Sequence, residues 1–307
     1  MVWVKKGKVF DPRDYDWTGT HAQVPTVLVK KDRLRVYYTD RDEKGKSYTT
    51  YVDLSKENPK DILYCHKKAV LSKGKPGTFD DEGAMSGFVR ERDGEVHLYY
   101  NGWNLRETIP YHNSIGLAIS KDGGHTFKRA FEGPLLDRTP LEPYLAVTPW
   151  VLKDHNIWHV WYVSGLSWEW INQKYEPIYS IKYAYSDDGL HWNRPNIDCI
   201  PRKSESEVFS HPTVIKKNDK FHMWFSYREC HDYRDGKGSY QMGYAESEDG
   251  KAWNRTDEVP GFEKSKEGWD STMISYPYAV ELNDRLHMFY NGNGFGQTGF
   301  GYAVWEN

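Results

Sequence analysis

The chain has 307 residues and a formal net charge of −3, from 41 basic and 44 acidic residues that are interspersed along the sequence. No basic stripe is present that would neutralise a phosphate backbone, so we expect no nucleic-acid partner. No stretch approaches the roughly 20 apolar residues that span a bilayer, so we expect no membrane association.

The composition favours strands and a reducing compartment. Aromatic residues make up 16% of the chain, and long runs of helix-forming residues at helical spacing are missing. The three cysteines, Cys65, Cys199 and Cys230, are odd in number, far apart and without zinc-ligand spacing. The first residues, Met1 to Lys6, lack the apolar region of a secretory signal. We therefore expect a soluble, cytoplasmic protein.

In chain order, the first expected element is a strand over Val2–Phe10, and a strand motif that repeats through the chain follows it. The repeated motif is alternating and rich in aromatic residues. Its copies are Leu34–Tyr38, Val96–Tyr100, Trp158–Tyr162, Phe221–Phe225 and Leu286–Tyr290, which start 62, 62, 63 and 65 residues apart. A polar turn and another short apolar strand precede each copy, which predicts a hairpin in every unit.

Later parts of the units predict a third and a fourth strand. Strands expected over Ser114–Ser120, Ser180–Ser186 and Gln241–Ser247 are followed by Asp-Gly turns, and Phe127, Trp192 and Trp253 open the fourth strands. Unit five stops after its third strand, near Gly299 to Glu306. We expect Val2–Phe10 to complete that unit. The sequence thus predicts an all-β fold, a single five-bladed β-propeller over residues 1–307 with four-stranded antiparallel blades, closed by the N-terminal strand.

The first strand of each unit contains a proline or a glycine nine residues before the repeated motif. These residues are Pro25, Gly87, Pro149, Pro212 and Pro277. Proline is tolerated at a strand edge, and the innermost strand of a blade has one edge on the central channel. The starts of these strands share one end of the molecule with the loops between strands two and three. Those segments are irregular, whereas the Asp-Gly turns at the opposite end are interchangeable, so we expect function at the irregular end.

That end brings together carboxylates, amides, an arginine and indoles, a mixture that suits a carbohydrate with apolar ring faces and hydroxyl-rich edges. The residues expected to contact it are His21, Gln23, Asp40, Glu82, Trp103, Asn104, Trp168, Glu169, Tyr227, Arg228, Asn291 and Asn293. Arg228 can pair with a substrate carboxylate or phosphate, or with Glu229. The segments Asn104 to Asn113 and Glu169 to Ile178 are expected to be long loops that wall the pocket.

The five-fold period, the order of the units and turns such as Ser186 to Trp192 resemble the five-bladed glycosidases that include arabinanases, xylosidases, invertases, levansucrases and mannoside phosphorylases. The resemblance spans the whole chain and rests on architecture and turns. It implies carboxylate catalysis near the starts of innermost strands, with an Asp in the first blade. In this chain, His21 and Gln23 stand at the start of the innermost strand of the first blade. Asp16 or Asp40 would have to reach the same space from a loop.

Glycoside cleavage needs one protonated and one ionised carboxyl on opposite sides of the anomeric carbon. By position, the catalytic candidates are Asp270, Glu207, Asp81, Glu142 and His211. A single acid at the start of a strand is more often a turn or capping group. The convergence of several candidates is therefore stronger evidence for a site than any one of them. His97, His159, His222 and His287 recur at one position of the repeat, which indicates packing.

These observations favour a glycoside hydrolase-like enzyme acting on a small glycan or sugar conjugate. Two alternatives remain: a carbohydrate-binding propeller without catalysis, and a different enzyme of sugar metabolism that uses histidine on the same scaffold. No cofactor is expected to be required. No metal site is predicted, although a calcium ion in the channel is compatible with the fold. The sequence does not give the oligomeric state.

Overall fold

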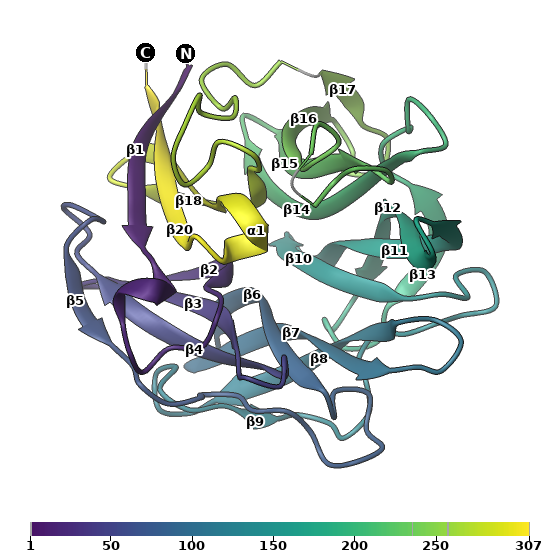
Figure 1. Cartoon of the computed structure of the whole chain (residues 1–307), viewed down its shortest axis with the longest axis horizontal. Coiled ribbons are helices and arrows are strands. Elements are labelled where there is room, and N and C mark those ends of the chain that lie inside the picture. The colour runs from purple at the N-terminus through teal and green to yellow at the C-terminus, as the bar shows by residue number, and fades with distance from the viewer. Residues whose placement is uncertain (1, 235, 257, 307) are drawn as a thin grey trace.

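The computed structural model describes residues 2–306 except residues 235 and 257. Nearly all of its regular structure is β-strand, and Figure 1 shows the strands grouped around a common centre. The helical segments of the described part are short: η1 (Pro12–Asp14) and α1 (Asn293–Gly296).

Three sheets have four strands each and are antiparallel throughout. They consist of β1 (Val2–Phe10), β20 (Phe300–Glu306), β19 (Arg285–Asn291) and β18 (Ser275–Leu282); of β10 (Ala146–Asp154), β11 (Ile157–Ile171), β12 (Lys174–Ser186) and β13 (Asn193–Asp198); and of β14 (Glu207–Lys217), β15 (Lys220–Glu229), β16 (Gln241–Ser247) and β17 (Asn254–Thr256). In the first of them β1 pairs with β20, with Trp3 opposite Trp305. The two ends of the chain therefore share one sheet.

The other strands form two antiparallel groups that one parallel bridge, between Ser47 and Gly83, joins into a larger sheet. The groups are β2 (Gln23–Val29), β3 (Leu34–Arg41), β4 (Ser47–Leu54) and β5 (Ile62–Cys65), then β6 (Gly83–Arg92), β7 (Glu95–Leu105), β8 (Tyr111–Ser120) and β9 (Lys128–Arg129). The strands β2, β6, β10, β14 and β18 contact one another in sequence, and β18 contacts β2. The first strand of every group thus faces the centre (Figure 1).

Each of these first strands has a break in register at the position that the sequence marks with proline or glycine. Where proline follows, the residue before it adopts a left-handed backbone: Val24 (φ 57°), Thr148 (φ 50°), His211 (φ 47°) and Tyr276 (φ 56°). Such conformations are costly for non-glycine residues and persist where surrounding contacts hold them. One such contact comes from the neighbouring sheet, since Asn291 accepts a hydrogen bond from the Val24 backbone N–H at 2.7 Å.

Two segments expected to be loops are instead extensions of hairpins. β11 continues to Ile171 and β12 starts at Lys174, so most of the segment 169–178 is strand. Its turn is formed by Asn172 and Gln173, which both have positive φ, as a tight two-residue hairpin turn requires. Likewise β7 runs to Leu105 and β8 starts at Tyr111. The sequence places these insertions correctly but does not reveal that their backbones pair.

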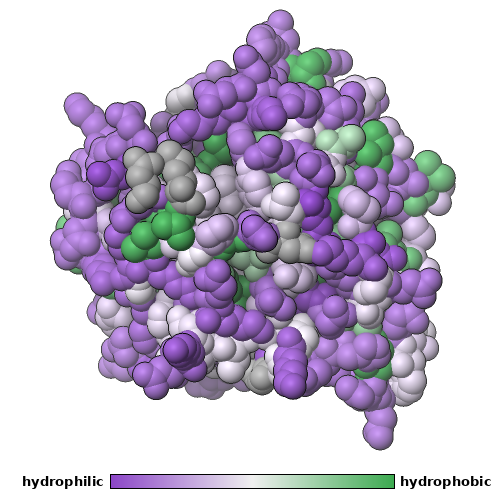
Figure 2. All heavy atoms as spheres, turned by 90° about the horizontal axis from the view of Figure 1, so that it is seen from above, coloured by the Kyte–Doolittle hydropathy of each residue, from purple (hydrophilic) through white to green (hydrophobic). Residues whose placement is uncertain are grey.

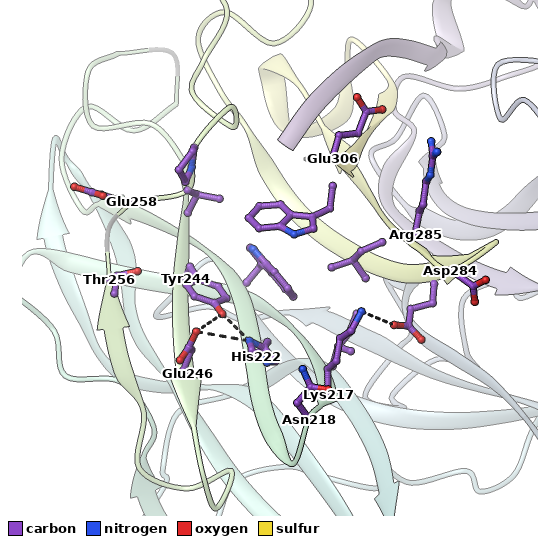
Figure 3. Close-up of a pocket in the computed structure, with 17 residues that line it drawn as sticks. Lys217, Asn218, His222, Tyr244, Glu246, Thr256, Glu258, Asp284, Arg285 and Glu306 are labelled. Carbon is purple, nitrogen blue, oxygen red and sulfur yellow. Dashed lines mark hydrogen bonds and ion pairs between the residues drawn. The ribbon is translucent and has the colours of Figure 1, made fainter. Parts of the chain in front are cut away.

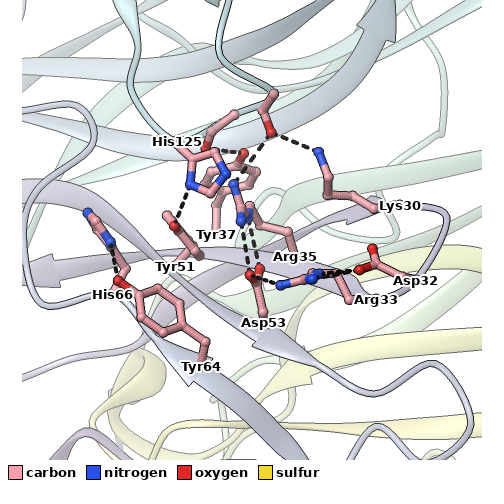
Figure 4. A network of polar contacts seen from close by, with 12 residues as sticks. Lys30, Asp32, Arg33, Arg35, Tyr37, Tyr51, Asp53, Tyr64, His66 and His125 are labelled. Carbon is pink, nitrogen blue, oxygen red and sulfur yellow. Dashed lines mark hydrogen bonds and ion pairs between the residues drawn. The ribbon is translucent and has the colours of Figure 1, made fainter.

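The Asp-Gly turns at the other end of the groups dock on the preceding group. In Figure 4, Arg35 forms a buried ion pair with Asp53, with a shortest distance of 2.8 Å. Arg35 and Lys30 also donate to the carbonyl oxygen of Gly123, and the Tyr37 hydroxyl donates to that of Gly124 at 2.8 Å. The turn of β8 and β9 is therefore a structural connection between groups.

The outer surface is mostly polar. In the view of Figure 2 hydrophilic residues predominate, and the hydrophobic ones form small scattered groups. Among the described residues, no helix has the length and apolar character needed to cross a membrane.

We predict that Gly124→Ala destabilises the protein by about 1–3 kcal/mol. Gly124 has φ +88°, and an added Cβ would lie 2.1 Å from the Tyr37 hydroxyl oxygen. Gly133→Ala is the matched control, because nothing lies within 4 Å of its Cβ position. The free energy of unfolding, measured by denaturant titration, checks this. Equal stability of the two variants would show that packing of the turn against the preceding group does not stabilise the protein.

Candidate functional site

The carboxylates at the starts of the first strands lie in buried clusters within their own sheets. Asp80, Glu142, Glu207 and Asp270 are each between 0 and 4% exposed. Each pairs with a cation from the outermost strand of the same group: Arg129 of β9, Arg194 of β13, Arg255 of β17 and Lys5 of β1. In three groups a tyrosine of the second strand also donates to the carboxylate: Tyr100, Tyr162 and Tyr290. We call each such arrangement a carboxylate clamp.

The clamp around Glu142 shows the geometry most fully. Arg194 binds both carboxylate oxygens, at 2.7 and 3.1 Å, and the Tyr162 hydroxyl lies 2.9 Å from each. Burial by itself raises the pKa of Glu142, but hydrogen bonds, first of all from Arg194, outweigh burial and leave the pKa lowered. The carboxylate is therefore ionised at neutral pH, and its hydrogen bonds join three strands of one sheet.

The first group lacks a clamp. Tyr38 holds the place of the clamp tyrosines, and among the described residues its buried hydroxyl has no hydrogen-bond partner. In the three clamps that contain a tyrosine, the acid stands twenty residues before it. The residue twenty positions before Tyr38 is Thr18, whose hydroxyl donates to the Tyr15 carbonyl. The sequence indicated that this group lacks the acid, and without that acid no clamp forms in it.

The structure places the remaining predicted site residues in two kinds of surroundings. Several take part in local hydrogen bonds, ion pairs or ring contacts: Asp40 (to the Gly19 and His21 N–H and the Tyr48 hydroxyl), Asp81 (to the Gly77 N–H), Glu82 (with Lys46), Trp103 (to Ser47), Glu169 (to Ser167), Tyr227 (under Arg255), Asn291 (to Val24 and Ala22) and Asn293 (to Thr272 and Met273). Asn104 is on β7, opposite His112. His21, Gln23, Trp168, His211 and Arg228 lie in or beside one further cluster.

This mouth cluster consists of Gln23, Arg41, Glu176, Tyr179, His211, Arg228, Tyr233, Tyr240 and Tyr276. At its centre the Gln23 amide donates to the Tyr276 hydroxyl at 3.2 Å and accepts from Arg41 at 3.0 Å. His211 packs edge-on against Tyr276, with ring centroids 5.8 Å apart. His211 is 1% exposed, and neither ring nitrogen has a hydrogen-bond partner among the described residues. Burial lowers its pKa to about 3, so the imidazole is neutral.

Arg228 anchors the aromatic side of the mouth cluster. Its guanidinium lies 3.7 Å from the ring centre of Tyr233, and the rings of Tyr179 and Tyr240 are 5.5 and 5.6 Å away. It donates to the Tyr240 hydroxyl and to the carbonyl oxygens of Pro177 and Glu229. The Glu229 carboxylate accepts from Ser206 instead. Of the two alternatives for Arg228, the ion pair with Glu229 is not formed, and Arg228 donates to the Glu229 backbone carbonyl instead.

Glu176 is the carboxylate of the mouth cluster. It accepts from the Tyr233 hydroxyl at 2.5 Å and from Arg234 at 3.0 Å, and it pairs with Lys174 at 3.0 Å. Burial raises its pKa, but these hydrogen bonds outweigh burial and leave the pKa lowered. An ionised carboxylate beside an aromatic ring can stabilise a positive charge that develops on a sugar ring.

Residues from further groups border the cluster. Tyr111 of β8 is in edge contact with Trp168, at 5.2 Å between centroids, and Phe295 of α1 lies 6.1 Å from Tyr240. His21 lies near Arg41, and burial followed by that positive charge lowers its pKa to about 4. Strands of every group therefore contribute to one place. In the described part of the chain, no group of three His, Cys, Asp or Glu residues is suited to hold a metal ion.

Sequence reasoning missed Arg41, Tyr276 and Glu176. Tyr276 precedes Pro277, just as His211 precedes Pro212, so the proline alignment contained a signal for it. Arg41 directly follows Asp40, which was selected as the polar residue of that loop. Glu176 has no comparable signal, because only the pairing of β11 with β12 brings it to Tyr233.

A separate groove lies on the flank, between the sheet of β14–β17 and the sheet that contains β18–β20 (Figure 3). His222, Tyr244 and Glu246 form a hydrogen-bonded chain on one wall. The turn residues Asn218 and Asp284 also line it, and no residue of the mouth cluster does. The groove is thus distinct from the mouth cluster.

Comparison with solved structures defines the class of fold. A solved glycoside hydrolase superposes with a TM-score of 0.78 and 18% identity, covering 99% of this protein and 92% of that hydrolase. A thermostable family-43 glycoside hydrolase (TM-score 0.67, 19% identity, 94% and 89% coverage) and the catalytic domain of the Coprinopsis cinerea GH62 alpha-L-arabinofuranosidase (0.68, 11%, 99% and 96%) are similar as well. The protein has the β-propeller fold of these glycoside hydrolases.

Curated relatives then define the family. "Uncharacterized protein MT1551" and "Uncharacterized protein Rv1502", both from Mycobacterium tuberculosis, are each 33% identical to this chain over 312 residues, with complete coverage of both sequences. The chain belongs to the same family as these mycobacterial proteins. No family model matches it.

We predict that Lys5→Met lowers the free energy of unfolding by about 2–4 kcal/mol, because it leaves the buried Asp270 carboxylate without its cation. Lys6→Met is the matched control: Lys6 pairs with Glu306, and both side chains are about one-third exposed, so we expect a loss below about 1 kcal/mol. Denaturant titration of both variants measures the difference. Equal losses would mean that the clamp of β1 does not stabilise the sheet.

We further predict that His211 makes the fold less stable in acid. Because the pKa of His211 is about 3 in the folded protein and about 6.5 when unfolded, only the unfolded chain takes up this proton as the pH falls from 6 to 4. The free energy of unfolding then drops by up to about 1.4 kcal/mol per pH unit from this group. His211→Asn removes that contribution, whereas the exposed His155→Asn retains it. An unchanged slope in His211→Asn would contradict the burial of a neutral imidazole.

Proposed function

We propose that the protein is a glycoside hydrolase-like enzyme that acts on a small glycan or sugar conjugate at the mouth cluster. We infer that residues 1–307 form a single domain with five blades around a central channel and that β1 completes the last blade. The contact of β18 with β2 and the pairing of β1 with β20 support this architecture. Lys5 of β1 also occupies the clamp position that fourth strands fill in other groups.

The observation that carries the proposed function is the convergence of every group on one mouth with the chemistry of a sugar site. Tyr240 and Tyr276 are buried and pack against each other, with ring centroids 5.8 Å apart. Tyr179 is partly exposed, and an aromatic face suits the apolar face of a pyranose or furanose. Gln23 and His211 supply polar groups for hydroxyls. The fold similarity to glycoside hydrolases over nearly the whole chain points in the same direction.

We assign to Glu176 the ionised carboxylate that stabilises an oxocarbenium-like transition state. It is held at one place by Tyr233, Arg234 and Lys174. The catalytic roles predicted from the sequence for Asp270, Glu207, Asp81 and Glu142 remain predictions. Asp270, Glu207 and Glu142 are paired with clamp cations, and Glu176 is likewise paired with Arg234 and Lys174. We choose Glu176 because it belongs to the mouth cluster, whereas the clamp carboxylates do not.

Carbohydrate binding without cleavage is the second candidate. One specific observation favours it: the mouth cluster itself contains a single carboxylate, Glu176, whereas the usual mechanism uses two. In that case the protein holds a glycan at the mouth cluster and releases it unchanged.

The test is a panel of aryl glycosides with Glu176→Gln compared with Asp270→Asn and Glu207→Gln. We expect the wild type to release the aryl group from at least one glycoside, and Glu176→Gln to lower kcat of the folded protein by about 100-fold or more. The two clamp variants should lower the melting temperature while the folded fraction retains kcat within several-fold.

Two results would change the assignment. If Asp270→Asn or Glu207→Gln abolishes turnover without a loss of stability, and Glu176→Gln stays active, the clamp carboxylates perform catalysis. If the wild type cleaves nothing but binds sugars, measured by calorimetry, the carbohydrate-binding function replaces the hydrolase.

A further inference from the structure

We propose that the sugar taken by the mouth cluster carries a negatively charged group, a carboxylate or a phosphate, and that Arg41 binds this group. The inference rests on the proposed function in one respect, namely that the mouth cluster takes a sugar. It goes further by giving the substrate its chemical class and by assigning a residue to the charge.

Arg41 is a cation without an acidic partner. Its guanidinium makes one hydrogen bond within the described part of the protein, to the Gln23 side-chain oxygen at 3.0 Å. Its Nε is buried, and no hydrogen-bond partner for it exists among the described residues. Burial lowers its pKa, and burial also raises the pKa of the nearby Tyr276 and Tyr111, so that both phenols are neutral at physiological pH and do not compensate the guanidinium.

An unpaired, partly desolvated guanidinium lowers the stability of the empty protein. A bound anion removes this cost, because carboxylates and phosphates accept two parallel N–H bonds from one guanidinium. A neutral sugar hydroxyl offers no such compensation. The arrangement of Arg41 is thus suited to an anionic ligand group.

Asp40 precedes Arg41 but does not neutralise the guanidinium. Its two carboxylate oxygens accept hydrogen bonds from the backbone N–H groups of Gly19, His21 and Arg41 and from the Tyr48 hydroxyl. These bonds hold the start of the first group in place. The Arg41 side chain is bonded to Gln23 and not to Asp40.

The rest of the mouth cluster adds positive charge. Arg228 is 2% exposed and is bonded to neutral acceptors, so its charge has no carboxylate partner among the described residues. Although burial disfavours the charge, the surrounding tyrosines raise the pKa of Arg228, and the group stays charged. Glu176 faces two cations, Arg234 and Lys174. The four cations of this region therefore outnumber the carboxylates Glu176 and Asp40.

Positive charge in a partly desolvated site acts over a longer range than in water. Arg228 is buried and raises the local potential, while Arg41, which is partly exposed, makes the contact. His21, which lies near Arg41, has a pKa of about 4 and is neutral at physiological pH, so it adds no further charge and can accept or donate a hydrogen bond.

The experiment measures binding of matched sugars to the full chain by calorimetry at low ionic strength. The members of each pair differ at C6, where the anionic sugar carries a carboxylate or a phosphate: D-glucuronate with D-glucose, D-galacturonate with D-galactose, and glucose 6-phosphate with glucose. We expect at least one anionic sugar to bind about tenfold or more tightly than its neutral partner. Comparison of the uronates with the phosphate tells which anion the site prefers.

Arg41→Gln should reduce that preference to about twofold or less, and Arg41→Lys should retain part of it because the charge remains without the guanidinium fork. Arg33→Gln is the charge-matched control, since Arg33 pairs with Asp32 and Asp53 at the far end of β2 and β3. Thermal unfolding checks that the variants are folded.

The inference is overturned if every neutral sugar binds as tightly as its anionic partner, or if folded Arg41→Gln keeps the wild-type preference. Failure of the proposed function looks different: anionic sugars then bind through Arg41, but no aryl glycoside is cleaved. If neutral glycosides are cleaved and anionic sugars are not preferred, the proposed function holds and the inference about an anionic substrate is wrong.

Discussion

A carboxylate held between a cation of the outermost strand and, in most cases, a tyrosine of the second strand ties a whole sheet together at the end where the first strand starts. Removing either charge leaves the other buried and unpaired, which is strongly destabilising. The four clamps therefore constrain the starts of the strands that face the centre. Lys5 extends this constraint to β1, so that the two ends of the chain are joined by charge as well as by backbone pairing.

The rigid starts of these strands explain where the mouth cluster forms. His211 and Tyr276 precede prolines at register breaks and adopt left-handed backbones, which aim their side chains differently from those of a regular strand. Arg41 and Glu176 come from a strand end and from an extended hairpin. The function that we propose thus depends on irregular positions, and the repeated positions carry the fold.

The difference between repeated and irregular positions also explains which features could be predicted from the sequence. The repeated strands, their turns and the strand over Val2–Phe10 follow from periodicity, and the structure contains each of them. Glu142 and Asp270 each stand twenty residues before a tyrosine, so they recur in the repeat just as the four packing histidines do. That recurrence is a signal of structure, whereas Arg41, Tyr233 and Glu176 have no repeated counterparts. Their proximity arises from pairing between strands and from long-range packing, which periodicity does not encode.

The central claim is that a sugar sits on the mouth cluster and that the clamp carboxylates stay in their ion pairs. A crystal structure of the protein with a sugar bound tests it most directly. We expect a sugar ring against Tyr179, with oxygen atoms within hydrogen-bond distance of Gln23 or His211 and with all four clamps closed. A sugar bound to Glu142, Glu207 or Asp270, with the clamp cation displaced, would contradict it.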